Sequence, residues 1–144
     1  MDHLAIMKKS WNLTMKILEG KKIIESRWYK TRYPPFDRIS VGDVVYFKDS
    51  GEPVKIRAEV SDVKQFSELT PAKVRQILDE YGERDGIDKQ KTNEFFQMFK
   101  DKKYCVLIFL KNPKAIEPFK VNKKGYGTMS SWICINKIED IKEN

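Results

Sequence analysis

Hydrophobic residues recur at helical spacing in three parts of the chain, which predicts three helices. In the first, Trp11, Met15 and Leu18 follow one another at intervals of four and three residues, so one face of a helix over about residues 9–19 is apolar. The second is expected to begin after Thr70, a favourable N-cap residue, and to end at the next glycine. The expected buried face of the second helix is Val74, Ile77, Leu78 and Tyr81. A short third helix, capped by Thr92, is expected to carry Phe95, Phe96, Met98 and Phe99.

Elsewhere apolar and polar residues alternate with a period of two, or form short apolar runs, and both patterns indicate strands. The predicted strands cover residues 22–29, 44–48, 54–63, 104–110 and 131–135. The run at 104–110 is continuously apolar, which favours a central position in a sheet. Short strands with helices beside them predict an α+β fold, a small β-barrel flanked by helices, in a single domain over residues 1–144.

The composition argues against a membrane protein, a secreted protein and a zinc-binding protein. With 40% hydrophobic and 34% charged residues, the chain has an ordinary globular balance. No apolar run is long enough to cross a membrane, and the N-terminus lacks the order of a signal peptide, so a cytoplasmic protein without membrane contact is expected. Cys105 and Cys134 lie in apolar runs and are interpreted as reduced core thiols. One histidine and two separated cysteines exclude a Cys/His zinc site, and neither a metal nor another cofactor is expected.

The net charge of +7 favours a polyanionic partner, because neutralising phosphates releases counterions. The charge is concentrated among aromatic rings in residues 20–38, a mixture that holds a nucleic-acid backbone while stacking bases. The basic residues there are Lys21, Lys22, Arg27, Lys30, Arg32 and Arg38, and the rings are Trp28, Tyr29, Tyr33 and Phe36. We therefore expect RNA or another single-stranded nucleic acid as the partner. A solvated face whose rings turn into the core is the alternative.

One short motif is more specific than the charge. Gly20-x-Lys22-x-x-Glu25-x-Arg27 follows a predicted helix and opens a strand. Here the chain resembles the ASCH family, a branch of the PUA-like superfamily, whose signature is a G-x-K-x-x-E-x-R run. The resemblance implies a β-barrel with a cleft between barrel and helices, lined by the motif residues. It also implies nucleic-acid binding, and some small members hydrolyse amide-modified nucleosides or cleave RNA.

The motif residues also have a direct physical interpretation. Glu25 and Arg27 are two positions apart on a strand, so they project from one face with Cα atoms roughly 7 Å apart. Lys22 lies at the mouth of the strand, where its ammonium can reach a phosphate or the carboxylate. The alternative is a structural salt bridge that seals a helix to the barrel. Tyr29 shares the face of Glu25 and is the better stacking candidate, whereas Trp28 on the other face is expected in the core.

A second group of candidates follows a glycine-rich loop. Ser130, Ser131 and Trp132 come after it and are interpreted as lining of the pocket, with the end of a core strand as the alternative. Lys123 and Lys124 would extend its basic rim. The complete set of expected nucleic-acid-binding residues is Lys21, Lys22, Glu25, Arg27, Tyr29, Lys30, Arg32, Lys123, Lys124, Ser130, Ser131 and Trp132.

Two other functions remain open. A small hydrolase acting on modified nucleosides or RNA would use Lys22 and Glu25 for acid–base catalysis. The resemblance places a threonine three residues after the motif lysine in amidohydrolase-type members, and here that position is Glu25, so a Thr–Lys mechanism is not expected. His3 is expected in a mobile terminus and is a poor candidate for a general base. The other alternative is a protein-interaction module whose basic face binds an acidic partner.

Overall fold

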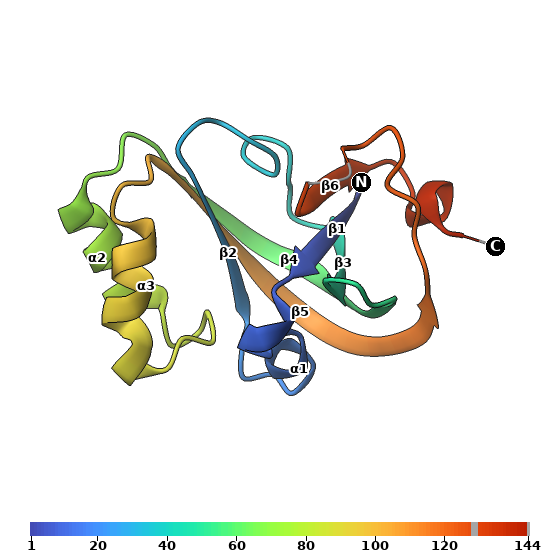
Figure 1. The fold of residues 1–144 in the computed structure, drawn as a ribbon, viewed down its shortest axis with the longest axis horizontal. Coiled ribbons are helices and arrows are strands. Elements are labelled where there is room, and N and C mark those ends of the chain that lie inside the picture. The colour runs from blue at the N-terminus through green and yellow to red at the C-terminus, as the bar shows by residue number, and fades with distance from the viewer. Residues whose placement is uncertain (128–129, 144) are drawn as a thin grey trace.

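The computed structural model describes residues 1–127 and 130–143, and a single curled sheet dominates it (Figure 1). Its strands are β1 (Asp2–Met7), β2 (Ile24–Tyr29), β3 (Val44–Asp49), β4 (Val54–Phe66), β5 (Tyr104–Phe119) and β6 (Trp132–Ile135). Their spatial order is β2-β5-β4-β3-β1-β6, and every neighbouring pair is antiparallel except β1 and β3. The long strands β4 and β5 curl the sheet into a partial barrel, so its two edge strands, β2 and β6, leave a seam between them.

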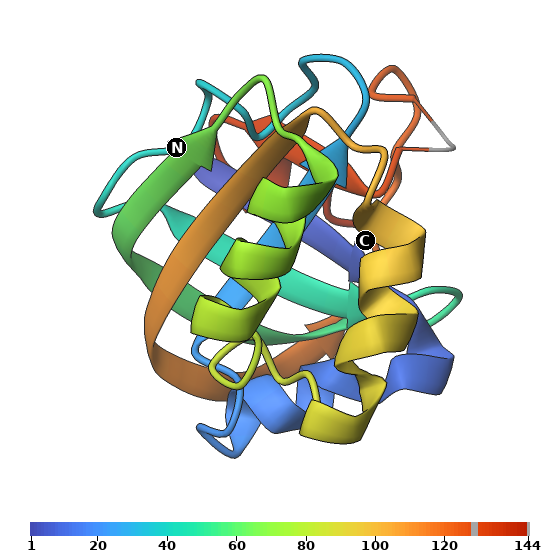
Figure 2. The same ribbon diagram turned by 90° about the vertical axis from the view of Figure 1, so that its left-hand side faces the viewer.

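The helices lie at two places around the sheet. The 3₁₀-turn Lys9–Trp11 and α1 (Leu13–Leu18) follow β1, while α2 (Pro71–Tyr81) and α3 (Thr92–Phe99) lie between β4 and β5 in the chain. Figure 2 shows α2 and α3 side by side across the sheet. Their apolar faces pack against Ile24 of β2 and Leu107 of β5. The remaining 3₁₀-turns are Lys89–Lys91 and Ile138–Ile141.

Local sequence signals explain most of these helices. The side chain of Thr70 accepts a hydrogen bond from the backbone N–H of Lys73 at 3.2 Å, which confirms the predicted N-cap of α2. The predicted buried residues of α2 are confirmed as well. The first helix was predicted as one continuous segment, and this is wrong. Asn12 has a φ of 56°, in the left-handed region, and this residue separates the 3₁₀-turn from α1.

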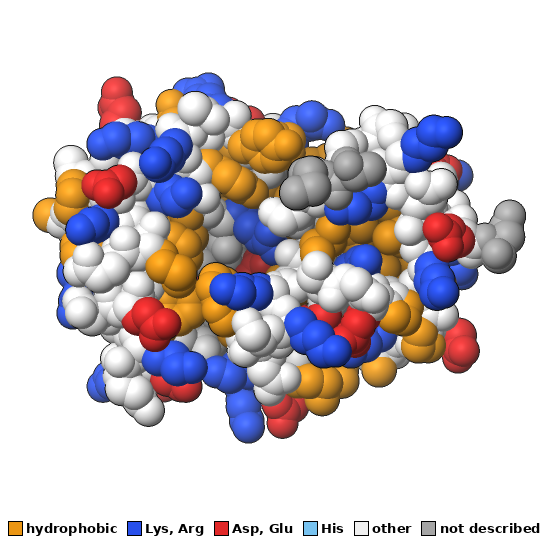
Figure 3. All heavy atoms as spheres, in the orientation of Figure 1, with side chains coloured by type: hydrophobic (Ala, Val, Ile, Leu, Met, Phe, Trp, Pro, Cys, Tyr) orange, Lys and Arg blue, Asp and Glu red, His pale blue; other side chains and the backbone are white. Residues whose placement is uncertain are grey.

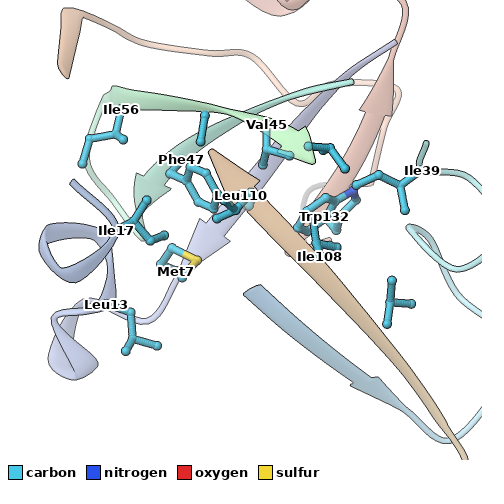
Figure 4. Packing of buried hydrophobic residues seen from close by; sticks show 14 of the residues in the cluster. Met7, Leu13, Ile17, Ile39, Val45, Phe47, Ile56, Ile108, Leu110 and Trp132 are labelled. Atoms are coloured by element: carbon cyan, nitrogen blue, oxygen red, sulfur yellow. The ribbon is translucent and has the colours of Figure 1, made fainter. Parts of the chain in front are cut away.

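The main core fills the inside of the curled sheet (Figure 4). Alternate residues of β3 and β4 face inward, including the buried Val45, Phe47 and Ile56. Trp132, at the start of β6, packs into the same cluster with Ile108. Cys105 is a buried free thiol, as expected, and Cys134 is a half-buried one. None of the helices in the described part of the chain is both long and apolar enough to span a membrane.

The N-terminus corrects one sequence-based expectation. His3 was expected in a mobile terminus, but it lies in β1, which pairs with both β3 and β6, and its side chain is completely buried. The indole N–H of Trp132 donates to His3 Nδ1 at 3.1 Å. Nε2 therefore carries the proton and donates to Asp43 at 2.8 Å. Six residues at the end of a chain give too short a pattern to predict a strand whose partners lie far away in sequence.

The buried histidine predicts a pH dependence of stability. Burial lowers the pKa of His3 below 6.5, although the Asp43 carboxylate opposes this shift. Below pH 6.5 the unfolded chain therefore takes up a proton that the folded chain does not, and the free energy of unfolding falls by at most about 1.4 kcal/mol per pH unit. His3 is the chain's one histidine. Urea unfolding at pH 7.0 and 5.5 should show this loss in the wild type and a flatter dependence in His3→Gln. Equal slopes in the two proteins would contradict the assignment.

Candidate functional site

A cleft of about 270 Å³ opens along the free edge of β2, between the end of β1 and α3. Figure 3 shows a hollow near the middle of this face, with basic and acidic side chains at its floor and hydrophobic side chains around it. Its polar lining includes Lys8, Lys22, Glu25, Ser26, Arg27, Tyr29, Asp85 and Ser131. Because β2 is an edge strand, both faces of the strand and its unpaired edge contribute to the cleft. The predicted division of β2 into one binding face and one core face is therefore too simple.

Lys22 is the centre of a buried ionic network. Its side chain is 1% exposed, and Nζ donates to the carbonyl oxygens of Ile24 and Asp85, each at 2.7 Å. Nζ also contacts the carboxylates of Asp85 and of Glu25, the latter at 3.1 Å. Burial would lower the pKa of Lys22, but the two carboxylates outweigh it and raise that pKa. The ammonium therefore stays charged, and all of its donors are occupied.

Glu25 is held as a carboxylate between two cations. One oxygen contacts Lys22, and the other accepts from Nε and an Nη of Arg27 at 3.1 and 2.8 Å. Burial would raise the pKa of Glu25, but the positive charges of Lys22 and Arg27 lower it below the usual value. Glu25 is consequently a poor proton acceptor. This argues against the sequence-based suggestion that Lys22 and Glu25 form an acid–base pair.

Arg27 connects the two sides of the seam. From β2 its guanidinium donates to the backbone oxygen and hydroxyl of Ser131, both at 3.2 Å, and to the Ile6 carbonyl at 3.4 Å. It also lies over the ring of Trp132, 5.1 Å from the ring centroid. Arg27 thus contacts β1 and the start of β6 across the gap that the sheet leaves open. Its side chain is 12% exposed.

Asp85 completes the network and was missed by the sequence analysis. It lies in the loop that follows α2, and its side chain is 6% exposed. One carboxylate oxygen contacts Lys22 and the other accepts from the Ser26 hydroxyl. Burial raises the pKa of Asp85, opposed by the charge of Lys22. Of the two carboxylates in the network, Asp85 is therefore the one better able to accept a proton.

Backbone contacts hold the Asp85 loop against β2. The carbonyl of Arg84 accepts from the N–H groups of Ile23 and Ile24, at 2.8 and 3.0 Å. Gly86 has a φ of 81°, and a Cβ there would lie 3.2 Å from a Lys22 carbon. Glycine thus fits both the left-handed conformation and the close packing over the lysine stem. A sequence pattern could have pointed to this glycine turn, but not to the lysine beneath it.

Aromatic rings line the cleft together with the ionic network. Trp28 and Phe99 are stacked, with ring centroids 4.8 Å apart and planes 7° apart. Trp11 and Phe95 meet edge to face at 5.3 Å. All four rings line the cleft. Trp28 was expected in the core, and it is buried, yet its edge also reaches the cleft.

The structure places some of the expected binding residues in the cleft and others elsewhere. Lys22, Glu25, Arg27, Tyr29 and Ser131 line it. Burial raises the pKa of Tyr29 to about 12, so the phenol stays protonated and donates to the Pro34 carbonyl. The residues that do not line it are Lys21, Lys30, Arg32, Lys123, Lys124, Ser130 and Trp132.

Trp132 differs most from the expectation of a pocket residue. It is 2% exposed and belongs to the main core, so the alternative of a core strand end describes it. Its contribution to the site is indirect, because its ring packs against the guanidinium group of Arg27. Ser130 donates to the Trp132 carbonyl at 2.7 Å, and Lys123 Nζ donates to the Ser130 carbonyl at 3.1 Å. Residues 128 and 129 of the preceding loop lie outside the described part of the chain.

Metal binding at the site finds no support among the described residues. Across residues 1–127 and 130–143, no group of three or more histidine, cysteine, aspartate or glutamate side chains could hold a metal ion. The two acidic side chains of the cleft are instead paired with Lys22 and Arg27.

The fold is similar to that of several solved structures. No protein-family model and no curated protein matches the chain. The structure is similar to that of ASCH from Zymomonas mobilis, with a TM-score of 0.67 and 16% identity over 96% of this chain and 90% of that one. A tyrosine-to-phenylalanine variant of the same protein gives a TM-score of 0.68 at 16% identity, covering 96% and 93%. The N-terminal domain of Staphylothermus marinus McrB gives 0.59 at 15% identity, covering 96% and 90%.

These likenesses show the fold alone, and they confirm the predicted one. The chain has the α+β, PUA-like barrel fold of ASCH domains, with helices beside a curled sheet.

The ionic network predicts a large difference between two adjacent lysines. Lys22→Met leaves the buried carboxylates of Asp85 and Glu25 without their shared cation, and should lower the free energy of unfolding by about 3–5 kcal/mol. Lys21, which is 70% exposed, is the matched control. Lys21→Met should change that free energy by no more than about 0.5 kcal/mol. Urea unfolding at pH 7 measures both, and an equally small loss in the two variants would rule out the buried network.

Proposed function

We propose that this domain binds single-stranded nucleic acid, with RNA as the expected ligand, by taking one base into the cleft. The observation that supports the proposal is that one cleft combines two kinds of surface. The stacked rings of Trp28 and Phe99 offer apolar surface, and the Glu25–Arg27 pair offers polar groups in the same cleft. Unstacked RNA bases are commonly bound in this way, by aromatic contact together with hydrogen bonds to their edges.

The balance of charge in the cleft favours a neutral base over a phosphate. Lys22 and Arg27 contribute two positive charges, and Glu25 and Asp85 contribute two negative ones. A phosphate entering here would have to compete with carboxylates already bonded to the cations. A base carries no charge and presents donors and acceptors to groups that are already oriented. Phosphates are better placed at the rim, where the exposed Lys8 lines the cleft.

The free edge of β2 supplies backbone groups for such a base. The carbonyls of Ile23, just before β2, and of Tyr29, at its end, accept hydrogen bonds from the β5 side, so the odd-numbered residues of β2 direct their backbone groups toward β5. Ile24, Ser26 and Trp28 direct theirs the other way, and the Ile24 carbonyl is already bonded to Lys22. The N–H and C=O groups of Ser26 and Trp28 therefore face the cleft, where a base edge can pair with them.

The size of the cleft and the overall charge agree with this proposal. A volume of about 270 Å³ is below the roughly 300–1,000 Å³ that is usual for drug-sized ligands, which suits a single ring system. The net charge of +7 would attract the rest of a polyanionic strand to the surface around it.

Blocking the cleft tests the proposal. Ser131 is exposed at its mouth, and Ser131→Trp should weaken binding of a labelled seven-nucleotide RNA at least about tenfold, because loss of base–aromatic stacking costs about 1–3 kcal/mol. Fluorescence anisotropy at 50 mM salt measures the affinity. Ser61→Trp, on an exposed part of β4, is the control and should bind as the wild type does. Equal RNA affinity in both variants, with unchanged melting curves, would contradict the proposed site.

Hydrolysis is a second candidate function, favoured by the contact between Ser26 and Asp85. The Ser26 hydroxyl lines the cleft, donates to Asp85 and accepts from the Trp28 indole N–H at 3.0 Å. In this reaction Ser26 Oγ would attack the acyl carbon of an amide-modified base, and its proton would pass to Asp85 and then to the leaving amine. Water would release the acid by the same proton route. Lys22 would hold Asp85 in place.

Two variants distinguish this reaction from binding alone. If Ser26 is the nucleophile, Ser26→Ala should abolish release of acid from acylated nucleosides, measured by chromatography, while RNA affinity stays within about twofold. Asp85→Asn should abolish it too. Absence of turnover in the wild type, or full turnover in Ser26→Ala, would reject this reaction and leave the binding proposal standing.

A further inference from the structure

A second groove has a lining residue next in the chain to one of the cleft. It encloses about 410 Å³ and is lined by Lys30, Glu68, Leu69, Thr70, Lys103 and Tyr104. Tyr29 lines the cleft and Lys30 lines the groove, and these are consecutive residues whose Cα atoms lie about 3.8 Å apart. A nucleic-acid strand with one base in the cleft would therefore have its next nucleotides near the groove.

The backbone holds Lys103 firmly at this junction. Its N–H donates to the Tyr29 carbonyl at 2.9 Å, and its own carbonyl accepts from the Leu69 N–H at 3.1 Å. The residue thus connects the end of β2 to the segment that leads into α2. Its ammonium lies 3.5 Å from the Leu69 carbonyl, a contact at the limit of hydrogen bonding that a phosphate could readily replace.

Two further cations lie near Tyr104: Lys30 lines the groove with it, and Arg32 contacts its ring. Lys30 is exposed, and within the described residues its ammonium makes no ion pair or hydrogen bond. The Arg32 guanidinium lies over Tyr104, 5.9 Å from the ring centroid, and contacts Asp37 at 3.6 Å in a pair that is well exposed on both sides. Such an exposed pair contributes little to stability and leaves the arginine available. Glu68 is the acidic residue among the groove's lining.

We infer that this groove, which we call the Tyr104 groove, is a phosphate-binding subsite for the nucleotides next to the one in the cleft. The inference rests on the proposed function. The cleft is nearly balanced in charge, which suits a neutral base. The groove carries an excess of positive charge, which suits the negatively charged phosphate backbone. The cleft pairs Lys22 and Arg27 with carboxylates, whereas among the described residues the groove lysines Lys30 and Lys103 form no ion pair with a carboxylate. The N-terminus of α2, capped by Thr70, adds partial positive charge at the same place.

The subsite accounts for two residues that were expected to bind nucleic acid but do not line the cleft. Lys30 and Arg32 were expected to bind nucleic acid, and neither lines the cleft. In the groove Lys30, which follows β2, lies beside Lys103, which precedes β5 and was not among the residues expected to bind. The ligand is thus a strand of at least a few nucleotides, and a free nucleoside would occupy the cleft alone.

The test compares two double variants of equal charge. Lys30→Ala/Lys103→Ala removes the groove lysines, and Lys111→Ala/Lys114→Ala removes two exposed lysines of β5 outside both sites. The groove variant should bind a labelled seven-nucleotide RNA about tenfold more weakly at 50 mM salt, with the slope of log affinity against log salt reduced by about 1.4, since each contact to a single strand contributes about 0.7. The control should change both quantities far less. Glu68→Gln should bind more tightly than the wild type.

The outcomes separate this inference from the function on which it rests. If the wild type does not bind the RNA at low salt, both are rejected. If the wild type binds and Ser131→Trp blocks binding, but the two double variants behave alike, the Tyr104 groove alone is rejected. Competition by poly-glutamate as effective as that by RNA, at equal charge and with the same dependence on Lys30 and Lys103, would assign the groove to an acidic protein and overturn the inference.

Discussion

The burial of the Lys22 ammonium group constrains the whole site. A charge that is removed from water must be matched by acceptors, and here the Ile24 carbonyl, the Asp85 loop and Glu25 provide them. These acceptors come from parts of the chain far apart in sequence, so satisfying one ammonium fixes the loop after α2 against β2. Glu25, fixed in turn, orients Arg27 toward the opposite side of the seam. The cleft is the space that remains beside this network.

The network also explains why the barrel can stay open without losing its shape. A sheet whose edge strands do not pair exposes backbone N–H and C=O groups. Such an edge can pair with another chain and cause aggregation unless something covers it. Arg27 connects the edges through side-chain hydrogen bonds to Ser131 and Ile6 in place of a continuous ladder. The backbone groups of Ser26 and Trp28 that find no partner among the described residues are thereby kept in a hollow, where the proposed ligand would complete their hydrogen bonding.

Local patterns predicted what depends on neighbouring residues in sequence. The period of α2, its Thr70 cap and the motif strand could all be predicted, and Glu25 and Arg27 do share one cleft. What depends on distant contacts could not be predicted. Asp85 lies in a polar loop whose sequence gives no sign of burial, and only the approach of Lys22 makes it a site residue. The groove around Tyr104 likewise joins segments that are separate in sequence.

The three tryptophans provide the most direct test of where the ligand lies. Trp11 and Trp28 line the cleft, whereas Trp132 is buried beneath Arg27 with its indole N–H bonded to His3. Their indole N–H resonances can be followed in ¹⁵N-labelled protein during titration with a short single-stranded RNA. The account predicts saturable shifts for Trp11 and Trp28 and a much smaller one for Trp132. Binding that leaves the Trp11 and Trp28 resonances unmoved would contradict it.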